Sequence, residues 1–138
     1  MQANILLICK CFLGKDLIMA KQSTTSARRS PCPIACALDT LGDKWTLLVV
    51  RDLFLGRKRF KDFTASPEKI PTNILSDRLE RLVQHGMVQQ IPLEESPGRQ
   101  GYALTEKGMA LQTVIKALLQ WGKEWEPGTV VGMRDRKA

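Results

Sequence analysis

The polar residues best suited to chemistry lie in the segment IPTNILSDRLERLVQHG, residues 70–86. Apolar residues recur in this segment with the period of an α-helix, so the polar residues share the opposite face. Asn73 can form a bidentate pair with adenine, and the hydroxyl groups of Thr72 and Ser76 can bond a base edge or a phosphate. This face is either a reader of double-stranded DNA or only the capped, solvated side of a surface helix.

Cationic side chains flank this segment on both sides. The run RKRFK precedes it, and Arg99 follows it in the turn of an expected hairpin. Asp77 and Glu80 on the polar face repel phosphate unless they meet a cytosine amino group or pair with a neighbouring arginine. We therefore expect the flanking cations to supply the phosphate contacts. The predicted DNA-binding residues are Arg57, Lys58, Arg59, Lys61, Thr72, Asn73, Ser76, Asp77, Arg78, Arg81 and Arg99.

The composition is compatible with a polyanionic partner. In 138 residues, 21 Lys and Arg against 14 Asp and Glu give a net charge of +7, which attracts nucleic acid or anionic membrane surfaces. The hydrophobic content of 43% is enough for one core, so we expect a single domain. The N-terminal apolar run is broken by Lys10 and is too short to cross a bilayer. We expect a cytoplasmic protein with no membrane partner.

The sequence indicates neither catalysis nor metal binding. It has no glycine-rich phosphate loop, and His85 is its only histidine. The four cysteines all lie within the first 36 residues, where they cannot staple the rest of a domain. The spacing of Cys32 and Cys36 is not that of a zinc ribbon. We therefore expect no enzymatic activity, no cofactor and no metal, and a reducing compartment.

A series of short helices must position the candidate DNA-reading residues. Proline and glycine punctuation predicts a first helix between Cys32 and Gly42. A second helix is expected between Asp43 and Gly56, with Asp43 as its cap. A short basic helix follows within residues 57–66, with its aromatic side chains in the core and its cations facing outward.

The DNA-reading helix and the hairpin after it have clear local signals. Pro71 and Thr72 mark the start of the helix, with Thr72 able to cap it, and Gly86 marks its end. Extended-type residues then flank the turn sequence SPG at residues 96–98, which predicts a two-stranded hairpin.

The last helix carries more apolar surface than a small domain can easily cover. Thr105 is expected to cap a single long helix over residues 106–125, whose apolar side chains form a broad stripe. A partner subunit is a natural place for the surplus. The predicted dimer-interface residues are Leu111, Val114, Ile115, Leu118, Trp121 and Trp125.

The chain divides by composition into three parts. Residues 1–30 are predicted to be a flexible N-terminal extension, in which Met19 is a candidate start of translation. Residues 31–126 are predicted to form the folded domain with its C-terminal dimerisation helix, and residues 127–138 a disordered tail.

The order of the predicted elements is that of a winged helix-turn-helix, in which the second helix of the motif enters the major groove. The runs CPIACALDTLGDKWTLLVVRDLFLGRKRFKDF, IPTNILSDRLERLVQHGMV and YALTEKG resemble the HxlR family of bacterial winged helix-turn-helix transcriptional regulators, from about Cys32 to Trp125. The resemblance implies a mainly α fold with a small β-hairpin, a homodimer formed through the first and last helices, a pseudo-palindromic operator and a wing around Arg99. Family members often carry Lys or Arg where this chain has Asn73, so the target sequence stays open.

The resemblance also singles out Cys32, because a cysteine before the first helix's proline recurs in the family and serves some members as a sensor of oxidants or electrophiles. The helix dipole and the nearby Arg28 and Arg29 would favour its thiolate. Cys32 could equally be an inert small side chain, and Cys36 is either a resolving thiol or a core residue. The alternative function is a winged-helix module that binds a protein partner and lacks sequence-specific DNA affinity.

Overall fold

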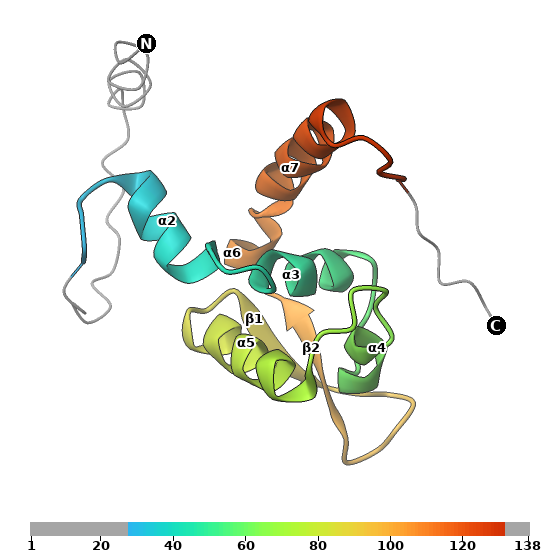
Figure 1. Cartoon of the computed structure of the whole chain (residues 1–138). Helices are drawn as coiled ribbons and strands as arrows, with labels where there is room; N and C mark the ends of the chain where they lie inside the picture. The colour runs from blue at the N-terminus through green and yellow to red at the C-terminus, as the bar shows by residue number, and fades with distance from the viewer. Residues whose placement is uncertain (1–27, 132–138) are drawn as a thin grey trace, which may run out of the picture.

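The computed structural model describes residues 28–131, which fold as helices around one two-stranded sheet (Figure 1). Most of the predicted N-terminal extension, including Met19, and residues 132–138 of the predicted tail lie outside the described residues. In chain order the elements are α2 (Pro33–Leu41), α3 (Thr46–Phe54), α4 (Phe60–Thr64), α5 (Thr72–Gln84), β1 (Val88–Pro92), β2 (Gln100–Leu104), α6 (Glu106–Met109) and α7 (Gln112–Trp125). The predicted winged helix-turn-helix order, mainly α with one hairpin, is confirmed.

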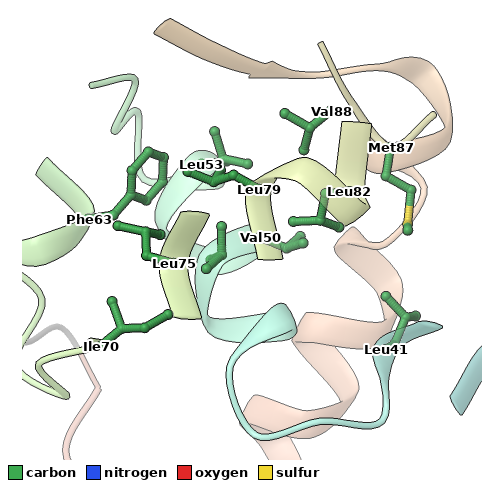
Figure 2. Packing of buried hydrophobic residues seen from close by; sticks show 11 residues of the cluster. Leu41, Val50, Leu53, Phe63, Ile70, Leu75, Leu79, Leu82, Met87 and Val88 are labelled. Atoms are coloured by element: carbon green, nitrogen blue, oxygen red, sulfur yellow. The ribbon is translucent and has the colours of Figure 1, made fainter. Parts of the chain in front are cut away.

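The core explains why the polar face of α5 points outward. Figure 2 shows Leu75, Leu79 and Leu82 of α5 gathered against Val50 and Leu53 of α3, and all five side chains are buried. These leucines recur at the helical period, so burying them leaves the residues between them on the solvent side. The prediction that α5 is amphipathic is therefore confirmed.

The hairpin is antiparallel and docks onto the segment before α4. Val88 pairs with Leu104 at one end of the ladder and Pro92 with Gln100 at the other. In addition to the hydrogen bonds between the two strands, the N–H of Tyr102 donates to the carbonyl oxygen of Lys58 at 2.9 Å. A Cβ atom on Gly101 would lie 2.9 Å from that same oxygen, so this close approach requires glycine. The basic segment and the hairpin therefore form one connected unit.

The start of α3 follows the sequence prediction, whereas the start of α5 differs in one detail. Trp45 takes the N-cap position of α3, and the Oδ1 atom of Asp43, two residues earlier, accepts from the N–H groups of Trp45 at 2.9 Å and Thr46 at 3.1 Å, as expected of a capping side chain. In α5, Thr72 is the first helical residue and Pro71 takes the N-cap position, with no capping hydrogen bond from a side chain. The prediction that Thr72 caps the helix is therefore wrong, because its backbone is already helical.

The prediction of one continuous C-terminal helix, made from the apolar stripe, is wrong. It divides into α6, capped by the Thr105 hydroxyl accepting from Gly108 N at 3.2 Å, and α7. At the junction, Leu111 N bonds to Gly108 O three residues back, and the four-residue pattern resumes only with Ile115 N to Leu111 O. A Cβ on Gly108 would lie 2.1 Å from Met87 O. Packing thus holds α6 against the hairpin, while α7 turns away from the body (Figure 1).

Candidate nucleic-acid interface

The N-terminal half of α5 presents the predicted base-reading residues to solvent. Thr72, Asn73, Ser76 and Asp77 are all exposed, while Leu75 between them is buried. The first helical hydrogen bond runs from Leu75 N to the carbonyl oxygen of the N-cap proline at 2.9 Å. No side chain caps this end of α5, so the N–H groups of the first turn remain open to an acceptor.

Arg78 points toward the protein and not toward the open face of α5. Its side chain is only 17% exposed, and its Nε donates to Asp43 Oδ1 at 2.8 Å. Its Nη1 also pairs with Asp77, the preceding residue. Its guanidinium thus joins α5 to the start of α3, and its predicted contact with DNA stays a prediction. Arg81 is half-buried, and Glu80 accepts from Gln84 Nε2 at 3.2 Å instead of pairing with Arg81.

Asp43 is held strongly in its charged form. Burial alone would raise its pKa, but hydrogen bonds from the Thr46 hydroxyl, Trp45 N, Arg78 and Thr46 N outweigh burial and lower the pKa to about 2. The carboxylate is therefore ionised at neutral pH and attracts the Arg78 guanidinium. The sequence indicated Asp43 only as a cap, because its second partner lies on a distant helix.

Arg57 lies in a buried polar cluster that the sequence did not reveal. Asp52 is 3% exposed, and its Oδ2 pairs with Arg57 Nη1 at 3.0 Å, while the Ser66 hydroxyl donates to Asp52 and accepts from Arg57. Arg51 pairs with Asp52, and its Nη1 and Nη2 atoms donate hydrogen bonds of 2.7 and 3.0 Å to the carboxylate of Glu68. The bond from Arg51 lowers the pKa of Glu68, and the bond to Glu68 raises the pKa of Arg51. Arg57 therefore links α3 to the segment between α4 and α5, and its predicted contact with DNA stays a prediction.

The other predicted cations divide into exposed side chains and one paired arginine. Lys58, Lys61 and Arg99 are exposed, the first two around the start of α4 and Arg99 at the hairpin turn. Arg59 is 31% exposed and pairs with Glu95 of the hairpin loop, which is 81% exposed. This ion pair links the start of α4 to the hairpin. Glu95 therefore offsets part of the positive charge that Arg59 could otherwise offer to a DNA phosphate.

Lys69 is a further exposed cation that the sequence reading missed. It lies in the connection between α4 and α5, with a φ of 51° and its N–H bonded to Ser66 O at 2.9 Å. A positive φ is unusual for a residue with a Cβ atom. The turn therefore sets Lys69 two residues before the N-cap of α5, close to the open N–H groups.

An apolar surface lies away from this polar face. Leu118 and Trp121 of α7 are 50% and 56% exposed, and Ile34 and Leu38 of α2 are similarly exposed. In Figure 1, α2 and α7 extend from the side of the body opposite the hairpin tip. Of the predicted interface residues, Leu111 and Ile115 instead pack partly against the core, while Val114, Leu118, Trp121 and Trp125 remain exposed.

Two cysteines lie at the start of α2, the helix that also carries the exposed Ile34 and Leu38. Cys32 is half-buried at the N-cap of α2, and its N–H donates to Ser30 Oγ at 3.1 Å. The Sγ of Cys36 donates to Ser30 O at 3.2 Å. Arg29, expected to favour a Cys32 thiolate, pairs with Asp39 at 2.8 Å, which offsets part of its charge.

Residues 28–131 also bear on membrane and metal binding. Within this range no helix is long and apolar enough to cross a membrane. The same range holds no group of three or more His, Cys, Asp or Glu side chains arranged to bind a metal ion.

Sequence comparison places these features in a known group of proteins. A family profile described as "HxlR-like helix-turn-helix" matches residues 40–129. Rv3095 of Mycobacterium tuberculosis, named as an HTH-type transcriptional regulator, is 42% identical over 91 residues, covering 66% of this chain and 57% of that protein. The chain thus spans little more than half of that mycobacterial relative. YodB of Bacillus subtilis, another HTH-type transcriptional regulator, is 38% identical over 102 residues, covering 72% of this chain and 91% of YodB.

Solved structures share the fold as well as the sequence. The crystal structure of PA1607 superposes with a TM-score of 0.69 at 39% identity, covering 83% of this chain and 81% of PA1607. Reduced YodB superposes with a TM-score of 0.59 at 38% identity, covering 71% of this chain and 98% of YodB. YodB has also been solved after diamide treatment and with bound quinone. The profile match and the extent of the similarity to YodB together show that the chain belongs to the HxlR-like helix-turn-helix family.

Proposed function

We propose that the protein is a DNA-binding transcriptional regulator that reads a specific operator with α5. The observation that carries this proposal is the exposed N-terminal half of α5, where polar side chains and open N–H groups share one surface. The major groove is about 12 Å wide and admits one such helix, and its base edges match amide and hydroxyl groups. The relatives named as transcriptional regulators support this function over a protein-binding module. A regulator of this kind acts on chromosomal DNA, so we place it in the cytoplasm.

The proposed contacts fall into two groups that revise the prediction from sequence. Base edges are read by the exposed first turns of α5, and phosphates are held by exposed or half-buried cations around it. Arg59 contributes in competition with Glu95, while Arg57 and Arg78 support the scaffold. The proposed base-reading residues are Thr72, Asn73, Ser76 and Asp77, and the proposed phosphate contacts are Lys58, Lys61, Lys69, Arg81 and Arg99.

We further propose that two copies pair through α2 and α7. The exposed apolar side chains of these helices favour this arrangement, because large apolar side chains in contact with water are unfavourable and a second copy would cover them. The surface lies away from α5 and the hairpin in Figure 1, so pairing would leave both reading helices accessible. Two reading helices related by a two-fold axis match a pseudo-palindromic operator.

Cys32 is proposed as the point at which an oxidant or electrophile changes DNA binding. It is an N-cap residue of α2, so the partial positive charge of the helix N-terminus favours a thiolate there. The crystal structures of YodB in reduced, diamide-treated and quinone-bound forms support a redox or electrophile response in a relative. A modified Cys32 would act through α2, which belongs to the proposed subunit interface.

The decisive experiment is a fluorescence-anisotropy titration of the reduced protein. One duplex carries the DNA upstream of its own gene, and a shuffled duplex of equal length and composition is the control, both at one salt concentration. A preference for the native duplex of about a thousandfold, the lower end for specific regulators, would support the proposal. Equal, salt-sensitive binding to both duplexes would contradict operator recognition there and favour a protein partner for the basic surface.

A further inference from the structure

The carboxylate of Asp43 stands where three helices meet. It follows Gly42, the C-cap residue of α2, and it caps α3 through the N–H groups of Trp45 and Thr46. The same Oδ1 atom accepts from Arg78 Nε on α5 at 2.8 Å. One side chain therefore touches the scaffold helix and the proposed reading helix immediately after the proposed dimer helix ends.

The position of Asp43 is tightly constrained by the chain before it. Gly42 N bonds to Leu38 O at 2.8 Å, and a Cβ atom on Gly42 would lie 2.4 Å from that oxygen. Only glycine allows this turn between α2 and α3. Because two backbone N–H groups at the start of α3 also hold the carboxylate, Asp43 presents a fixed acceptor to α5.

Arg78 is the matching contact on the reading helix. It lies one turn or less from Ser76 and Asp77, and three residues after the buried Leu75. Its side chain is 17% exposed and that of Asp43 is 24% exposed, so water screens this pair less than a surface pair. The pair constrains the rotation and tilt of α5, which the leucine stripe alone would leave looser because apolar packing is not directional.

We propose that Asp43 is a positioning residue for DNA reading, which holds α5 through Arg78 so that Asn73 and Ser76 meet the base edges in register. This inference rests on the proposed function. Asp43 itself touches no DNA, and Arg78 supplies the link and not a phosphate contact. Loosening the pair therefore weakens discrimination between operators while leaving the charge-driven attraction to any duplex in place.

The test uses variants that separate the link from the cap. Asp43→Ser keeps a good N-cap residue but is too short to hold Arg78. Arg78→Met keeps an unbranched aliphatic side chain and removes the guanidinium. Asp39→Ser is the matched control, because it removes a carboxylate on α2 that pairs only with the exposed Arg29 among the described contacts. Circular dichroism melts confirm that each full-length variant is folded before titration.

We expect each single variant to lower the preference for the native duplex over the shuffled duplex by about tenfold. Affinity for the shuffled duplex and the slope of log K against log salt should stay near wild type. The double variant should lose about as much preference for the native duplex as the more affected single variant, because both substitutions remove the same link. Asp39→Ser should keep the wild-type preference.

The opposite pattern would overturn the inference. If Arg78→Met weakened both duplexes alike and reduced the salt slope by about 0.9, Arg78 would be a phosphate contact. If the wild-type protein preferred the native duplex and both single variants kept that preference, the positioning role alone would be rejected. A wild-type protein without any preference would reject operator reading itself, and the inference with it.

Discussion

Arginine side chains in this protein meet carboxylates in two different settings. Asp52 is buried and shared by Arg51 and Arg57, whereas Asp39 pairs with Arg29 at the surface of α2. Ion pairs at the surface contribute little because water and salt screen them. Breaking a buried pair leaves a charge without its partner, which is far more costly.

Asp52→Ala should therefore lower the free energy of unfolding by about 3 kcal/mol. The buried polar cluster would lose the carboxylate that pairs with Arg51 and with Arg57, whose side chain is 13% exposed. Urea denaturation followed by circular dichroism measures this change. Asp39→Ala is the matched control, with an expected loss below about 0.5 kcal/mol. Similar losses in both variants would mean that the cluster around Asp52 does not brace the fold.

Asn73→Ala should relax specificity at one operator position. The amide of Asn73 is exposed on the first turn of α5, where a bidentate contact to adenine is worth about 1–3 kcal/mol of discrimination. Anisotropy titrations against single-base variants of the operator would show the change. Gln84→Ala, which removes an exposed amide from the last turn of the same helix, should leave the pattern intact. A uniform loss across all sequences would instead place Asn73 on a phosphate.

Cys32→Ser should abolish any effect of diamide on DNA affinity while leaving binding by the reduced protein intact. The reason is that the thiolate is the group that reacts, and serine replaces it with a hydroxyl group while keeping nearly the same side-chain size. The measurement is the titration above, repeated before and after diamide treatment. Cys36→Ser, one helical turn away, shows whether the second thiol takes part. An unchanged diamide response in Cys32→Ser would reject Cys32 as the sensor.

At the scale of elements, the hairpin and α4 are coupled through both backbone and side chains. The backbone link is the hydrogen bond from Tyr102 N to Lys58 O, and the ring of Tyr102 meets that of Phe63 edge to face at 6.3 Å. The side-chain link is the pair between Arg59 and Glu95. The hairpin is therefore linked to the basic segment at two points, and Glu95 pairs with Arg59, one of the cations proposed to contact phosphate.

Glu95→Gln should strengthen DNA binding and steepen its salt dependence. Releasing Arg59 adds about one phosphate contact, which changes the slope of log K against log salt by about 0.9. Glu94→Gln is the matched control, because it removes the same charge from the neighbouring exposed residue without releasing Arg59. Titrations at several salt concentrations give both slopes. Equal changes in the two variants would show general repulsion of DNA and no specific competition for Arg59.

At the scale of the whole molecule, the polar reading face and the apolar face lie on different sides. The division of the predicted terminal helix into α6 and α7 contributes to this arrangement, because α6 stays packed on the hairpin while α7 extends outward (Figure 1). Leu118 and Trp121 are thereby brought into solvent, where a second copy of the chain can cover them.

Leu118→Glu should shift the protein from dimer to monomer. A buried carboxylate at a subunit interface is unfavourable because it loses its hydration without gaining a partner. Sedimentation equilibrium should show the mass falling from twice the chain mass to the chain mass of 15.5 kDa. Gln120→Glu adds the same charge on another face of α7 and should leave the dimer intact. A wild-type protein that is monomeric at micromolar concentration would contradict the proposed interface.

The sequence by itself determined the features that depend on local chemistry. The spacing of Leu75, Leu79 and Leu82 predicted the buried side of α5, and the residues around Gly98 predicted the hairpin turn, whose φ of 81° at Gly98 suits glycine. Asp43 was recognised as a cap because a cap acts within three residues. Periodicity, capping and turn preference are all properties of short segments, so they can be recognised in the sequence alone.

Only the tertiary structure decided which groups the long charged side chains pair with. Arg57 and Arg78 look like any other surface cations in the sequence, but the fold brings Asp52 and Ser66 to the first and Asp43 to the second. The break before α7 likewise depends on Met87 O lying against Gly108, 21 residues further along the chain. Periodicity and propensity carry no information about such encounters, because they arise from how distant helices pack against one another.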